Sequence, residues 1–101
     1  MELSFSAIAI EWRGPAPFVF VPVPPDESEL IRESARELTY GWGAIPVSAT
    51  IGATTFTTSL FPREGRYLLP LKVAVQRAEG VGLGDEVAVR MRLGGRVSRR
   101  G

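Results

Sequence analysis

The sequence contains no cysteine and no histidine. Without cysteine, the chain has no disulfide framework and no thiolate nucleophile. Without either residue it also lacks the usual ligands of zinc and the base of Ser-His-Asp or Cys-His catalysis. Its acidic residues do not follow the D-x-D-x-D-G spacing of a calcium loop. We therefore expect no metal and no cofactor.

Long apolar runs are missing as well. The sequence has no stretch of about 18 apolar residues, the length that a membrane-spanning helix needs. The opening residues Met1–Ser4 show no basic segment followed by an apolar one, so they do not resemble a signal peptide. We expect a cytoplasmic protein without membrane contact. With 101 residues, of which 45% are hydrophobic and 23% charged, the chain suits a single globular domain.

Charge is nearly balanced overall but unevenly placed. The net charge is +1, yet Arg96, Arg99 and Arg100 alone supply three positive charges, which leaves residues 1–95 at −2. We expect residues 1–95 to form one β-barrel domain and residues 96–101 to form a basic, disordered tail. The acidic body argues against specific nucleic-acid binding, whereas the tail could touch phosphate groups.

Alternating apolar residues predict strands over most of the chain. The clearest case is Val87, Val89, Met91 and Leu93, which alternate with polar or small residues. Near Ala7 the apolar phase shifts, which predicts a bulge or a strand that serves two surfaces. The predicted strands are Leu3–Arg13, Phe18–Val23, Ile45–Ile51, Thr54–Phe61, Arg66–Leu69 and Asp85–Leu93.

Two segments show helical spacing. Asp26 and Glu29 form a pair like a capping box, which predicts a helix near Glu27–Leu38 with Leu30 and Ile31 in its apolar stripe. Pro70 suits the first position of a second helix near Leu71–Glu79, and a glycine at position 80 suits its end. Because the strands follow one another as hairpins, we predict a mainly β fold, a small six-stranded barrel with two short helices. The predicted core is Ile45, Val47, Ile51, Phe56, Leu60, Val75, Val87, Val89 and Met91.

Five separated blocks of residues carry a resemblance to a known family. They are Tyr40–Val47, Ile51–Gly52, Thr58–Pro62, Gly65–Lys72 and Gly84–Val87. In order and spacing these blocks resemble the bacterial family called domain of unknown function 1905. The resemblance implies a small double-split β-barrel and brings no established activity or catalytic residues. That barrel type is similar to the one in AbrB-like transcription factors, which is a likeness of fold alone.

Several residues in the middle of the chain could contact a ligand. Trp42 lies between two glycines, so its ring could stack on a base or flat ligand, or it could pack on the barrel. The run Thr54–Ser59 could present hydroxyl groups, or it could reflect the β-propensity of a half-exposed strand. Ser59 and Lys72, the only lysine, could form a Ser-Lys pair, although no oxyanion hole is visible. The glycine-rich Gly80–Gly84 follows a helix and precedes a strand, the reverse of a phosphate loop, so we reject that role.

The start of the second helix gives a sharper hypothesis. If the helix begins at Pro70, the next three backbone N–H groups lack intrahelical partners and favour an anion. Arg66 could add charge from the preceding strand, and Ser59 could add a hydroxyl group. Alternatively, Lys72 points into solvent or caps a nearby carboxylate. The candidate anion- or ligand-binding residues are Trp42, Ser59, Arg66, Leu71, Lys72 and Val73.

Three functions follow from these observations. The first is a non-enzymatic binding or interaction module of unknown partner, with a small anionic ligand as one candidate. The second, by analogy of fold with AbrB-like proteins, is a nucleic-acid-binding barrel. The third is a small enzyme that uses carboxylates or Ser59 and Lys72. The partner and the oligomeric state stay open.

Overall fold

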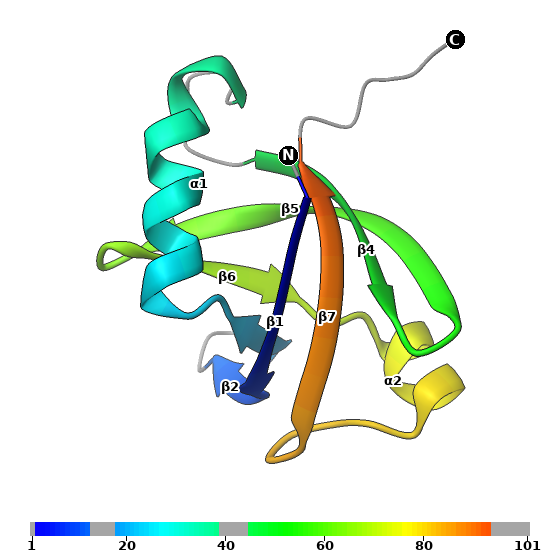
Figure 1. The fold of residues 1–101 in the computed structure, drawn as a ribbon. Helices are drawn as coiled ribbons and strands as arrows, with labels where there is room; N and C mark the ends of the chain where they lie inside the picture. The colour runs from blue at the N-terminus through cyan, green and yellow to red at the C-terminus, as the bar shows by residue number, and fades with distance from the viewer. Residues whose placement is uncertain (1, 13–17, 39–44, 94–101) are drawn as a thin grey trace, which may run out of the picture.

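The computed structural model describes residues 2–12, 18–38 and 45–93. In these residues seven antiparallel strands form a curled sheet in the order β1-β7-β4-β5-β6-β3-β2, and two helices pack against it (Figure 1). The predicted mainly β class is confirmed, with seven strands where the sequence indicated six. The elements are β1 Glu2–Ile8, β2 Ile10–Trp12, β3 Phe18–Pro22, α1 Pro25–Leu38, β4 Ile45–Ile51, β5 Thr54–Arg63, β6 Arg66–Pro70, α2 Val73–Glu79 and β7 Glu86–Leu93.

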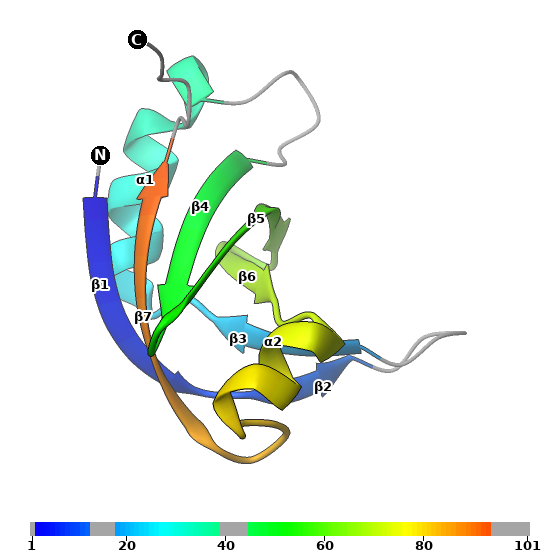
Figure 2. The ribbon, with the colours of Figure 1, turned by 90° about the vertical axis from the view of Figure 1, so that its right-hand side faces the viewer.

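The additional strand arises because the predicted first strand changes partners at Ala9. β1 pairs with β7, whereas β2 pairs with β3 at the other end of the strand order. Ala9 donates its N–H to the Asp85 carbonyl at 2.9 Å and accepts from the Gly84 N–H at 3.0 Å. Its small side chain is buried, so the chain can bend inward there. The expected strand serving two surfaces is thus present, and the sheet curls into a half-barrel (Figure 2).

The core fills the inside of the curl. Along β7 every second side chain is buried, from Val87 to Leu93, as the alternation predicts. Inward residues of the opposite strands, including Val21 and Leu69, join the same cluster. Fully burying each large aliphatic side chain contributes about 1.5–3 kcal/mol before the entropy cost of folding. All the predicted core residues are buried except Phe56, which is half-buried against the cluster.

Helix α1 begins at Pro25, two residues before the predicted Glu27. Proline suits the first helical position, because its missing N–H would have no intrahelical partner. Asp26 therefore lies in the first turn, where its negative charge interacts favourably with the helix dipole. Both Ile31 and Leu30 were predicted to lie in the apolar stripe of this helix. Ile31 is buried, but the prediction was wrong for Leu30, whose side chain is exposed to solvent.

Polar bonds fix the start of α1 to β6. The buried Ser28 hydroxyl donates to the Val23 carbonyl at 3.1 Å and accepts from the Tyr67 N–H at 3.3 Å. Arg66 donates to the same Val23 carbonyl from Nε at 3.3 Å and from Nη2 at 3.1 Å. These bonds satisfy backbone groups that the bend between β3 and α1 would otherwise leave unpaired.

Helix α2 is fixed to the β4–β5 hairpin by Glu79. This carboxylate accepts from the Ala53 N–H at 3.3 Å and from the Thr54 hydroxyl at 2.5 Å. The helix ends as predicted at Gly80, which has a left-handed backbone with φ of 65°, and the Val81 N–H donates to the Gln76 carbonyl. Of the helices in the described ranges, neither has the length and apolar content to cross a membrane.

Candidate functional site

The outer face of the sheet carries two rows of polar side chains. Because buried and exposed residues alternate along β7, Arg90 and Arg92 both point outward. In the first row, Arg90 lies opposite Ser4 of β1 and Thr50 of β4. Thr50 lies in turn opposite Thr55 of β5. Antiparallel pairing therefore places one arginine among three hydroxyl groups that come from separate strands.

The second row lies next to the first. Arg92 is opposite Glu2 of β1 and Ser48 of β4, and Ser48 is opposite Thr57 of β5. Arg92 Nη2 is 3.4 Å from the Glu2 carboxylate, and both side chains are more than two-thirds exposed. An ion pair so open to solvent contributes little, typically about 0–1 kcal/mol. A stronger anion could therefore compete with Glu2 for Arg92.

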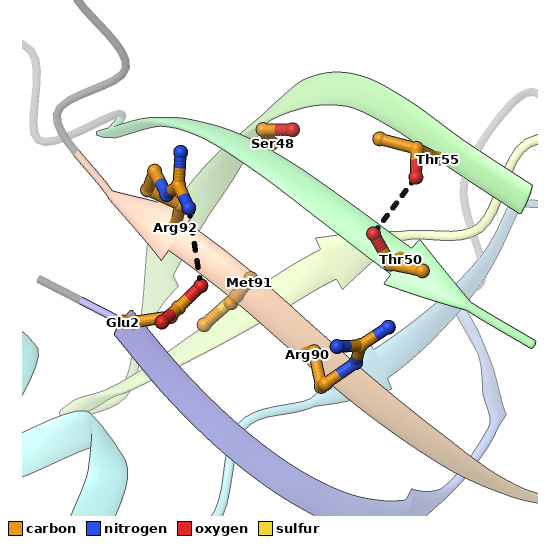
Figure 3. A pocket seen from close by; sticks show the side chains of 7 residues that line it. All are labelled: Glu2, Ser48, Thr50, Thr55, Arg90, Met91 and Arg92. Atoms are coloured by element: carbon orange, nitrogen blue, oxygen red, sulfur yellow. Dashed lines mark hydrogen bonds and ion pairs between the residues drawn. The ribbon is translucent and has the colours of Figure 1, made fainter. Parts of the chain in front are cut away.

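A shallow hollow of about 270 Å³ lies on these rows (Figure 3). Met91, which is buried, lies in the chain between the two arginines that border it. The hollow is smaller than the usual range for drug-sized ligands, about 300–1,000 Å³, so it suits a group of the size of phosphate or carboxylate. We call this surface the arginine face; its residues are Glu2, Ser48, Thr50, Thr55, Arg90 and Arg92.

The hydrogen bonding of the arginine face leaves donors unused. Within the described part of the chain, the Arg90 guanidinium makes no hydrogen bond or ion pair. The Thr50 and Thr55 hydroxyl oxygens are 2.9 Å apart, so one hydroxyl donates to the other. The second hydroxyl hydrogen is free to donate elsewhere. Figure 3 shows Thr50 on β4, the strand next to that of Arg90, and Thr55 on β5, the strand beyond it. Guanidinium and hydroxyl donors together match the acceptor oxygens of an anion.

A second hollow of about 520 Å³ continues along the same sheet and shares Thr50 and Arg90 with the first. Ser4 and Ser6 of β1 and Gly52 of the hairpin also line it. Arg90 therefore borders both depressions, so a ligand larger than one anionic group has room to extend over β1 and β7.

The comparison with family models gives one match. Residues 5–91 match the model described as "Domain of unknown function (DUF1905)". The chain belongs to this family. The resemblance found in the five sequence blocks is thereby confirmed. A search of curated proteins finds no match for the chain.

The family match divides the arginine face of this DUF1905 domain. Arg90, Thr50, Thr55 and Ser48 lie within the matched residues, whereas Glu2 and Arg92 lie outside them. Arg90, Thr50 and Thr55 of the first row are thus part of the family domain, whereas Ser4 of that row lies one residue outside the match. Glu2 and Arg92, which form the ion pair, lie just outside the two ends of the matched residues.

The structure of the DUF1905 domain corrects the predicted start of the second helix. Pro70 is the last residue of β6, Lys72 is the N-cap, and the first helical residue is Val73. The Leu71 N–H is not free, because it donates to the Val19 carbonyl at 2.9 Å. Pairing between β3 and β6 continues through this point and takes precedence over the helix-starting preference of proline.

Of the six predicted ligand-binding residues, five lie in the described ranges; Leu71, Lys72 and Val73 lie together at the start of α2, whereas Arg66 lies apart from them. Lys72 Nζ donates to the Thr57 carbonyl at 2.9 Å, and Ser59 lies two residues further along β5. Arg66 is at the opposite end of β6 from Leu71, roughly 16 Å along an extended chain, and bonds the Val23 carbonyl. Trp42 lies outside the described residues. Binding of an anion by these residues stays a prediction.

Sequence analysis missed the arginine face, although it recognised two of its components. The outward positions of β7 were identified, and the run Thr54–Ser59 was noted as a possible source of hydroxyl groups. What joins them is the pairing of β4 with β7, two strands far apart in the sequence, which local sequence does not specify. Among the described residues, no group of three or more acidic side chains is placed to hold a metal ion.

Proposed function

We propose that this DUF1905 domain is a non-enzymatic binding module and that its arginine face binds a small anionic ligand. The observation that carries the proposal is the Arg90 guanidinium, which has no partner among the described residues and borders a hollow lined by Thr50 and Thr55. A charge-assisted hydrogen bond is stronger than a neutral one, and arginine can form two in parallel with one carboxylate or phosphate.

The supporting positions are fixed by the sheet. Arg90 and Arg92 are two residues apart on one strand, so their Cα atoms are separated by roughly 6.7 Å. Thr50 and Thr55 flank the β4–β5 turn, and Glu79 holds that turn against α2. A preformed set of donors loses less conformational entropy when it binds a ligand than a flexible one does.

The nucleic-acid alternative has less support. Binding to a phosphate backbone needs several cations, whereas the arginine face offers two and places Glu2 beside them. Among the described residues no aromatic side chain lines this hollow, so these residues offer a base no stacking surface there.

The enzymatic alternative also has less support. In a Ser-Lys mechanism the lysine must face the serine as its base. Here Lys72 Nζ instead donates to the Thr57 carbonyl. The Ser59 hydroxyl has no hydrogen-bond partner among the described residues. The cytoplasmic location expected from the sequence stays a prediction.

A titration of ¹⁵N-labelled protein with inorganic phosphate tests where the anion binds. We expect the amide signals of Ser48, Thr50, Thr55 and Arg90 to shift together and to saturate at millimolar phosphate. Shifts that cluster elsewhere, or that grow without saturation over the whole sheet, would contradict the proposal.

A further inference from the structure

A separate hollow of about 480 Å³ lies between the start of β3 and the start of α2. Both elements are labelled in Figure 2. Its volume is within the range of small-molecule sites. Most of its lining is apolar, unlike the arginine face. The lining includes Phe18, Val19, Pro70, Leu71, Lys72 and Val73.

The floor of this hollow is apolar because its backbone groups are already paired. The Leu71 N–H donates to the Val19 carbonyl at 2.9 Å, and the Gln76 side-chain amide donates to the Leu71 carbonyl at 2.8 Å. The Leu71 side chain itself is buried. A ligand that enters the hollow therefore meets hydrocarbon at its base and leaves no backbone group there without a partner.

The walls are large apolar side chains that remain exposed. Phe18 is 58% exposed and Val73 is 59% exposed, and they project from different elements, β3 and α2. The Phe18 ring contacts the Phe20 ring edge to face, with centroids 6.4 Å apart, which limits its freedom. Covering these two side chains would remove apolar surface from water.

Among the described residues, one charged side chain borders the hollow. Lys72 supplies it, and the bond from Nζ to the Thr57 carbonyl, 2.9 Å long, holds the ammonium on the β5 side. An ammonium group has three donors, so two remain for a ligand. In the described part of the chain the hollow therefore combines a mostly apolar lining with one positive charge.

We infer that this hollow is a second binding site and that it takes a small carboxylic acid with an aliphatic or aromatic body. The carboxylate contacts Lys72 Nζ, and the apolar body lies over Leu71 between Phe18 and Val73. One ammonium balances one carboxylate, whereas a phosphate dianion would leave uncompensated charge against apolar walls. The site is independent of the arginine face, since the two share no residue.

The test is a titration of ¹⁵N-labelled protein with octanoate, kept below its micelle concentration. We expect saturable shifts at the amides of Val19, Leu71, Val73 and Gln76. Octanol, which lacks the charge, and propionate, which lacks the chain, should each bind at least fivefold more weakly. Equal affinity for octanol and octanoate, or shifts centred on other residues, would overturn the inference.

Two charge-removing variants separate the specific contribution of Lys72 to octanoate binding from the effect of a lower net charge. Lys72→Met should weaken octanoate binding at least fivefold, whereas Arg77→Met, which removes a cation from the exposed side of the same helix, should change it less than twofold. Val73→Asp places a negative charge at an exposed wall and should abolish binding even if Lys72→Met is unstable. Wild-type affinity in Lys72→Met or in Val73→Asp would exclude the site.

Discussion

Replacing Gly52 with alanine probes how the β4–β5 hairpin is held against α2. Gly52 has φ of +60°, where an alanine costs about 1–2 kcal/mol. An added Cβ would lie 2.0 Å from Glu79 Oε1, so the carboxylate must move. Its bonds to the Ala53 N–H and the Thr54 hydroxyl would then be strained or lost, at roughly 1–2 kcal/mol more.

Gly52→Ala should therefore lower the free energy of unfolding by about 2–4 kcal/mol, measured by urea denaturation with an unchanged m-value. Gly80→Ala is the matched control, because Gly80 has a similar φ of +65° but no atom within 4 Å of the added Cβ. It should cost about 1–2 kcal/mol. In a Glu79→Ala background the cost of Gly52→Ala should fall to the same value. Equal losses for the two glycine variants, or no change of the Gly52→Ala cost in that background, would refute the role given to Glu79.

Two further substitutions test the buried polar contact at α1 and the ion pair at the arginine face. Ser28→Ala should lower the free energy of unfolding by about 1–3 kcal/mol, because the buried Tyr67 N–H and the Val23 carbonyl each lose a hydrogen bond to the hydroxyl. The measurement is urea denaturation, and an unchanged midpoint would contradict this prediction. Glu2→Gln should raise the affinity for inorganic phosphate roughly twofold to fivefold, because it releases Arg92 from an exposed ion pair that contributes about 1 kcal/mol at most. The affinity is measured by NMR titration. A lower affinity would show that Glu2 does not compete with the anion.

The parts of the fold that the sequence predicts well are those set by local patterns. Alternation along β7 predicted the buried Val87, Val89 and Met91, because side chains of a strand point to opposite faces. The end of α2 at Gly80, whose backbone is left-handed, was also predicted from a local pattern, a glycine after a helical segment. The family resemblance added the barrel type, which patterns alone did not distinguish from other curled sheets.

The failures come from contacts between distant segments. The helix predicted from Pro70 begins at Val73 because β3, about 50 residues earlier, continues its pairing to Leu71. Leu30 and Ile31 were both assigned to the buried stripe, but of the two Ile31 is buried and Leu30 is exposed. The arginine face depends on the register of β7 with β1, strands at the two ends of the chain, so no local pattern could reveal it.

The central claim is that Arg90 holds an anion, and the most direct test is the phosphate affinity of Arg90→Met against wild type and Arg77→Met. Loss of charge-assisted hydrogen bonds, about 1.5–3 kcal/mol, should weaken phosphate binding by tenfold or more in Arg90→Met. Arg77→Met makes the same change in net charge outside the arginine face and should stay within twofold of wild type. Equal affinities in all three proteins, or equal weakening in both variants, would contradict the proposed anion site.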